Sequence, residues 1–163
     1  MFKVSKFLND IKDNLLNVEI QLIESFNELQ NIFFTEDTKV LVIRSGISDS
    51  EINIVLYAQT DMFDPIETLE DSNFFDSKIM VDHFLLYDFS AISEDKYDDF
   101  DDFYFDNDLE KKSMKEIGFF IKKCYEKSKF KFDKPFYYSV LDEDDVLNLN
   151  TGNFEKIDDV VLD

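Results

Sequence analysis

Apolar residues recur at intervals of three and four along the segment from Val4 to about Phe33. This spacing places them on one side of an α-helix and leaves charged residues on the other sides. The segment contains no glycine or proline, although Asn14 and Asn17 could divide it into two helices. The pattern predicts a long N-terminal helix packed on a sheet, with a coiled coil as the alternative. The apolar stripe comprises Val4, Phe7, Leu8, Ile11, Leu15, Val18, Leu22, Phe26, Leu29 and Ile32.

Segments rich in β-branched residues follow this helix and predict three strands. The strands are expected at Lys39–Ser45, Glu51–Gln59 and Lys78–Phe89. The residues Gly46–Ser50 between the first two predict a turn, so this pair is expected to form a hairpin. The acidic stretch before the third strand contains a proline that could start a short helix, Pro65–Glu70.

A second amphipathic segment predicts a helix from Asp108 to about Lys129. Asn107 followed three residues later by Glu110 resembles a capping box at the start of this helix. The segments Phe136–Leu141 and Val146–Leu149 then predict a second hairpin.

The order of these elements predicts the fold class and the domain organisation. Strands occur in groups instead of alternating with helices, which favours an α+β fold over a parallel α/β fold. We expect the long N-terminal helix and the second helix to pack on a mainly antiparallel sheet. A chain of 163 residues is long enough for one substantial core, so a single domain covering residues 1–163 is predicted.

The composition combines a strong negative charge with many apolar residues. The chain has 37 acidic and 17 basic residues, a net charge of −20, yet 44% of its residues are hydrophobic and 16% are aromatic. The apolar fraction indicates a folded protein rather than a disordered acidic chain. The charge disfavours direct binding to nucleic acids or anionic membranes, because such contacts require lysine and arginine.

The cysteine and histidine content excludes several kinds of site. Cys124 is the only cysteine, which rules out an intrachain disulfide and a cysteine-based zinc site. Cys124 lies on the apolar stripe of the second helix, so we expect it to be buried. His83, the only histidine, lies in a predicted strand and is expected to be structural. No cofactor is predicted, and the absence of a signal-peptide-like or membrane-spanning apolar segment favours the cytoplasm.

The segment Tyr97–Glu110 is the strongest candidate for a functional site. It contains seven carboxylates, five aromatic rings and no basic residue. The carboxylates would attract a cationic partner, and aromatic side chains commonly anchor protein interfaces. The last residues of this segment are expected to cap the second helix. A basic protein partner is therefore expected to contact the beginning of the segment. The candidate contact residues are Asp95, Tyr97, Asp98, Asp99, Phe100, Asp101, Asp102, Phe103 and Tyr104.

Two conformations of this segment are compatible with its sequence. It could be a solvated loop whose rings face the core while its acids face water. In an extended conformation, alternate carboxylates would instead lie about 6.6 Å apart on one face and could imitate a phosphate backbone.

Two metal-dependent functions are less favoured. An EF-hand is excluded because Phe103 and Tyr104 occupy the positions of an oxygen ligand and the turn glycine. A magnesium-dependent nuclease is an alternative, because Asp64 and Asp76-Ser77-Lys78 fit its loose pattern of acids and lysine. Similar triplets recur in so acidic a chain, and the net charge would repel a nucleic acid substrate.

Positive charge is concentrated in the region of the second helix. Residues Leu109–Lys134 include nine lysines and four acids, whereas Thr60–Asp108 includes sixteen acids and two bases. The favoured interpretation is that these lysines offset neighbouring acids and suit the C-terminal end of the helix. The alternative is a second binding patch or a self-association surface.

The small size, strong acidity and lack of a catalytic motif resemble the properties of bacterial immunity proteins. Aromatic residues beside aspartates, as in Tyr97-Asp98 and Tyr104-Phe105-Asp106, are typical anchors for such an interface. The resemblance is to a class and involves no family-specific motif. It implies a non-enzymatic inhibitor that neutralises a cognate, basic, nuclease-type toxin by direct binding. The alternatives are a nucleic-acid mimic that inhibits a host DNA-binding protein and an assembly protein that oligomerises through its first helix.

Overall fold

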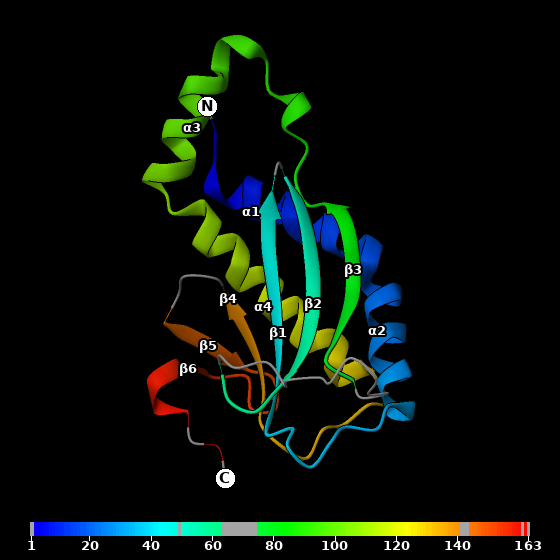
Figure 1. Cartoon of the computed structure of the whole chain (residues 1–163). Helices are drawn as coiled ribbons and strands as arrows, with labels where there is room; N and C mark the ends of the chain where they lie inside the picture. Colours follow the sequence, from blue (N-terminus) through cyan, green and yellow to red (C-terminus); the bar gives the residue numbers. More distant parts are fainter. Residues whose placement is uncertain (1, 49, 63–74, 141–143, 161, 163) are drawn as a thin grey trace.

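A six-stranded sheet forms the centre of the fold, and helices cover one of its faces (Figure 1). The computed structural model describes residues 2–48, 50–62, 75–140, 144–160 and 162. The strands are β1 (Val40–Ser48), β2 (Glu51–Gln59), β3 (Ser77–Leu85), β4 (Phe136–Val140), β5 (Asp145–Asn148) and β6 (Phe154–Lys156). The α-helices are α1 (Val4–Leu15), α2 (Glu19–Glu28), α3 (Tyr97–Asp106) and α4 (Leu109–Lys127).

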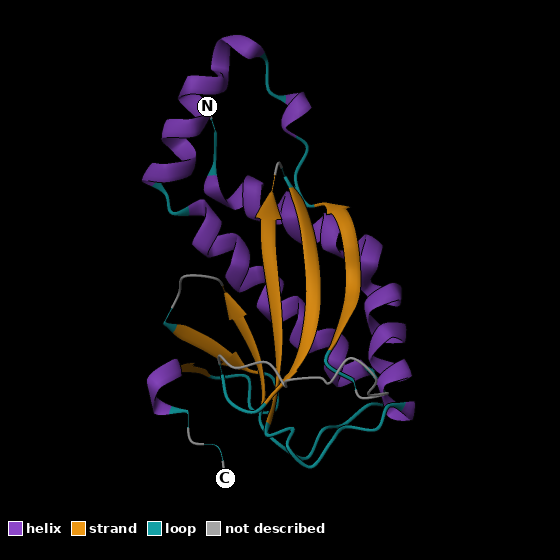
Figure 2. Ribbon diagram, viewed as in Figure 1, coloured by secondary structure: helices purple, strands orange, loops and turns teal. Residues whose placement is uncertain are grey.

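The predicted α+β class is confirmed (Figure 2). The strand order is β3-β2-β1-β4-β5-β6. The central strands β1 and β4 pair in parallel, and every other neighbouring pair is antiparallel. The predicted mainly antiparallel sheet is therefore correct, with one parallel pairing at its centre.

The N-terminal helical segment follows the predicted apolar stripe. A single 3-10 turn at Leu16–Val18 separates α1 from α2, in the region where Asn14 and Asn17 indicated a break. Both helices contact α4, and α2 also contacts β3, so the stripe packs within the fold rather than forming a coiled coil. The buried stripe residues are Phe7, Ile11, Leu15, Val18, Leu22, Phe26 and Leu29.

The β1–β2 hairpin is tighter than the sequence predicted. Gly46 pairs with Asn53 and Ser48 pairs with Glu51, so both strands extend into the predicted turn. Ser50, which lies in the short connection, has a φ angle of 74°. Gly46 gave a misleading turn signal because a glycine can also be accommodated within a strand ladder.

Strand β3 is shorter than predicted and ends at Leu85 rather than Phe89. Its pairing with β2 is irregular opposite residues 52–55. His83 has a φ of 44°, and its backbone amide donates a hydrogen bond to Asn53 Oδ1 at 2.7 Å. After Leu85 the chain leaves the sheet, and the Leu86 amide donates to the Ser50 carbonyl at 2.8 Å.

The outer edge of β3 is covered at its middle by side chains of α2. The Ser25 hydroxyl and the Gln21 amide both donate to the Met80 carbonyl, at 3.1 and 3.5 Å. Because an unpaired strand edge is a template for pairing with other chains, this cover disfavours strand addition at β3.

Two predictions around α3 and α4 are wrong. The acidic-aromatic segment is helix α3, where a loop or an extended chain was expected. The capping box is also absent, because the Asn107 side chain instead donates to the Phe103 carbonyl at 2.8 Å. Asp108, with a φ of 48°, precedes the first residue of α4, Leu109, and its side chain makes no cap hydrogen bond.

The C-terminal part confirms the second hairpin and extends it. Strands β4 and β5 are antiparallel as predicted, and β6 adds a strand that was not predicted. On the sheet face opposite the helices, Val42 and Tyr137 belong to a small apolar cluster that Ile157 and Val160 cover. The predicted short helix Pro65–Glu70 lies outside the described residues.

A close approach of α4 to β4 makes Gly118 a sensitive position. A Cβ atom at Gly118 would lie 2.7 Å from a ring carbon of Tyr138. We expect Gly118→Ala to lower the free energy of unfolding by about 1–3 kcal/mol, because overpacking moves either the helix or the strand. Urea unfolding measures this change. A gain in stability, as the higher helix propensity of alanine alone would produce, would contradict the close contact.

Candidate functional site

Helix α3 has a buried aromatic face and an exposed acidic face. In Figure 1 it lies at one end of the molecule, beside the N-terminus. The helical period turns Phe100, Phe103 and Tyr104 toward the body of the protein. The predicted extended row of carboxylates is therefore wrong. The exposed residues of the helix are Tyr97, Asp98, Asp99, Asp101, Asp102, Phe105 and Asp106.

Phe100 is the main hydrophobic anchor of α3. Its side chain is only 2% exposed and contacts rings from the N-terminal segment and from the loop after β3. The ring centroids of Phe2, Phe89 and Tyr87 lie 5.1, 5.3 and 5.9 Å from that of Phe100. Such separations are typical of favourable aromatic pairs. These contacts attach α3 to α1 and to the loop after β3.

The structure changes the set of aromatic residues that can contact a partner. Phe100 was predicted as a contact residue but is buried, while Phe103 and Tyr104 pack against the core and are only partly exposed. Burial, with a smaller contribution from the Glu110 carboxylate, raises the pKa of Tyr104 to about 12. Of the predicted aromatic contacts, only Tyr97 is well exposed to solvent, at 43%.

Phe105 is a second exposed ring of α3, and it was not among the predicted contact residues. Its side chain is 73% exposed. Phe105 follows Phe100 by five residues, which places it about 140° around the helix from the buried anchor. The helical spacing of Phe100, Phe103 and Tyr104 was the signal in the sequence that could have placed Phe105 on the outer face.

The exposed carboxylates of α3 repel one another. Asp98 lies three and four residues before Asp101 and Asp102, and Asp102 lies four before Asp106. Each like-charge pair at these spacings destabilises a helix by about 0.2–0.5 kcal/mol. Asp98 and Asp99 also lie in the first turn, where the helix dipole favours them. Among the described residues, none of these aspartates forms an ion pair, so a cationic partner would relieve the repulsion.

The residues just before α3 also belong to the predicted site. Asp95 lies in a 3-10 turn, Glu94–Lys96, and its side chain is exposed. The acidic surface therefore begins one turn before α3 and continues along the outer side of the helix. We call the exposed side chains of Asp95, Tyr97, Asp98, Asp99, Asp101, Asp102, Phe105 and Asp106 the α3 outer face.

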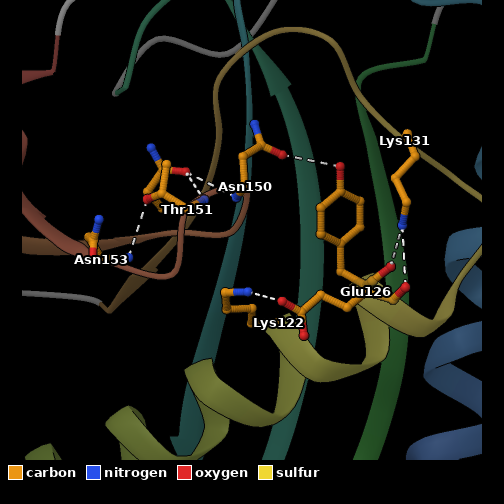
Figure 3. Close-up of polar contacts among 8 residues, drawn as sticks. Lys122, Glu126, Lys131, Asn150, Thr151 and Asn153 are labelled. Carbon is orange, nitrogen blue, oxygen red and sulfur yellow. Dashed lines mark hydrogen bonds and ion pairs between the residues drawn. The ribbon is translucent and has the colours of Figure 1, made fainter.

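The lysines around α4 are largely engaged within the protein. Figure 3 shows Lys122 paired with Glu126 and Lys131 directed at backbone oxygens near the end of α4. Cations at this end interact favourably with the helix dipole. These contacts favour local neutralisation over a second binding patch. Further ion pairs are Lys12–Glu116, Lys123–Glu19 and Lys127–Glu19.

Cys124 and His83 lie in environments that are typical of structural residues. Cys124 is buried as predicted, and this burial, with a contribution from the Glu19 carboxylate, raises the pKa of its thiol to about 12. The thiol therefore remains protonated and unreactive at neutral pH. His83 is exposed on an edge strand, where its Nδ1 atom lies 3.1 Å from Glu51 Oε2.

The nuclease pattern does not assemble in the described part of the chain. Lys78 pairs with the Glu28 carboxylate, and the Asp76 carboxylate accepts a hydrogen bond from the Ser77 amide at 2.6 Å. Asp64 lies outside the described residues. In the ranges that the structure describes, no three histidine, cysteine, aspartate or glutamate side chains form a group that could hold a metal ion.

Comparison with known proteins identified no relative. No protein-family model, no curated protein and no solved structure matches the chain. Within the described segments, no helix is long and apolar enough to cross a lipid bilayer.

Proposed function

We propose that this chain is a non-enzymatic acidic binding protein that neutralises a cognate basic protein in the cytoplasm. The resemblance to bacterial immunity proteins favours a nuclease-type toxin as that partner. The observation that carries the proposal is the α3 outer face, where carboxylates that form no ion pair with any described residue flank the exposed ring of Phe105. Interfaces commonly combine an apolar anchor with charged residues around it.

The arrangement of α3 fits recognition of a helix by a groove. Asp98, Asp101, Asp102 and Phe105 occupy positions i, i+3, i+4 and i+7, which lie along one side of a helix. Helices that bind in grooves present their anchors with this spacing. A basic groove with an apolar pocket would accept the ring of Phe105 and pair with the aspartates.

Electrostatics would act mainly on the rate of association. A net charge of −20 attracts a basic partner over a distance that depends on salt, because the Debye length is about 10 Å at 0.1 M. Attraction of this kind raises association rates by about 10- to 1,000-fold. The acidic α3 outer face would then orient the encounter.

Site-specific photocrosslinking tests the proposal. The photoreactive residue p-benzoylphenylalanine would replace Phe105 in one variant and Ile20, which is 71% exposed on α2, in the control. We expect the Phe105 variant to crosslink in host cells to a protein of net positive charge whose toxicity is suppressed by co-expression of this chain. The Ile20 variant should give no such adduct.

Two outcomes would contradict the proposal. One is crosslinking from Ile20 to the same partner at equal yield, which would remove α3 as the contact surface. The other is capture of a host DNA-binding protein with no toxin present, which would favour the nucleic-acid mimic instead.

A further inference from the structure

A cavity of about 260 Å³ lies between the start of α1 and helix α3. Its walls are aromatic, formed by Phe2 and Phe7 from the N-terminal segment, Tyr87 from the loop after β3, and Phe100 and Phe103 from α3. The stacked rings of Phe2 and Phe103 lie 5.5 Å apart. A cavity with these walls suits a flat apolar molecule.

The rim of this cavity is basic, in contrast to the neighbouring α3 outer face. Lys3, Lys6 and Lys96 line it together with a single acid, Asp10, which pairs with Lys6 at 3.1 Å. Among the described residues, the Lys3 and Lys96 ammonium groups make no hydrogen bond or ion pair. Three of the 17 basic residues of a strongly acidic chain therefore surround one aromatic cavity.

A second hollow with lysines and aromatic rings lies near the exit of α4, and two of its three lysines, Lys129, Lys131 and Lys134, bond to the backbone. There, Lys131 Nζ donates to the Tyr125 carbonyl at 3.1 Å, and Lys134 Nζ donates to the Thr38 carbonyl at 2.5 Å. These two ammonium groups stabilise the backbone. Among the described residues, the ammonium groups of Lys3 and Lys96 make no such bond and can contact a ligand, whereas in the second hollow this holds for Lys129 alone.

We propose that the cavity between α1 and α3 binds a small planar aromatic molecule that carries one or two anionic groups. The aromatic walls would contact its ring system, and the lysines would donate charge-assisted hydrogen bonds to a carboxylate, sulfonate or phosphate. A cationic molecule would be repelled by the rim, and a neutral one would leave the lysines unused. The residues of the cavity differ from those of the α3 outer face, which adjoins it at Lys96, and the proposal does not depend on the proposed function.

Nuclear magnetic resonance titration with naphthalene-2-sulfonate tests this site. We expect amide shifts to concentrate at Lys3, Lys6, Tyr87, Lys96 and Phe103. Combining Lys3→Gln, Lys6→Gln and Lys96→Gln should weaken binding at least tenfold. Naphthalene-2-carboxamide, which lacks the charge, should bind the unmodified protein at least tenfold more weakly.

A matched control removes the same number of charges elsewhere. Lys12→Gln, Lys123→Gln and Lys127→Gln change exposed or partly exposed lysines on the helical face and should leave the affinity for naphthalene-2-sulfonate within twofold. Equal weakening in both triple variants would overturn the proposal, because only net charge would then matter. Shifts centred away from the cavity, or equal binding of the neutral carboxamide, would also overturn it.

Discussion

Replacing Phe100 by alanine is expected to lower the free energy of unfolding by about 3–5 kcal/mol, the usual cost of removing a buried phenylalanine ring. Replacing Phe105 should change it by no more than about 0.5 kcal/mol, as is typical of exposed positions. The two residues lie in the same helix, but Phe100 is 2% exposed and Phe105 is 73% exposed. Equilibrium unfolding in urea, followed by circular dichroism, measures both changes.

The milder variant Phe100→Leu extends this test if the alanine variant fails to fold. It keeps most of the apolar volume and should cost less than Phe100→Ala. Either substitution should also speed amide hydrogen exchange in residues 97–106. The reason is that Phe100 holds α3 in place through contacts with rings outside the helix. Equal effects of Phe100→Ala and Phe105→Ala would contradict the orientation of α3.

Neutralising the acidic part of α3 is expected to slow association with the basic partner at least tenfold at low salt. The variant combines Asp98→Asn, Asp99→Asn, Asp101→Asn and Asp102→Asn. Asparagine keeps the size of each side chain but removes its charge, and rates that depend on electrostatic steering respond strongly to such changes. Removal of the like-charge pairs should offset the loss of favourable dipole interactions in the first turn, so the fold should remain stable.

A matched control separates a local effect from the effect of net charge. Glu36, Asp37, Asp158 and Asp159 are exposed acids in segments that lie away from α3 (Figure 1). Changing them to Gln or Asn also removes four negative charges. This control should slow association less than threefold, because the segments lie away from α3 (Figure 1) and screening weakens the effect of distant charges at the contact.

Residue spacing and residue type in the sequence predicted much of the core. The helical stripe from Phe7 to Leu29 and the β-branched strand from Glu51 to Gln59 both form as predicted, and Cys124 is buried. The same rule, applied to the rings of α3, would have predicted a helix. The high density of charge in that segment instead favoured a loop or an extended chain, despite the helical spacing of Phe100 and Phe103.

Other features were not predictable from local patterns. The parallel pairing of β1 with β4 joins segments that are far apart in the chain, and no short-range signal specifies it. The short strand β6 is only three residues long and follows Gly152 closely. The pocket between α1 and α3 likewise depends on tertiary packing, which brings Phe2 beside Phe103.

The most direct test of the central claim measures association rates with the crosslinked partner at about 50 and 300 mM salt, which brackets the range where screening changes strongly. The account predicts that salt slows the unmodified protein at least tenfold, that the α3 variant is slow at both concentrations, and that the matched control follows the unmodified protein. Equal rates for all three proteins, unaffected by salt, would contradict the role of the α3 outer face.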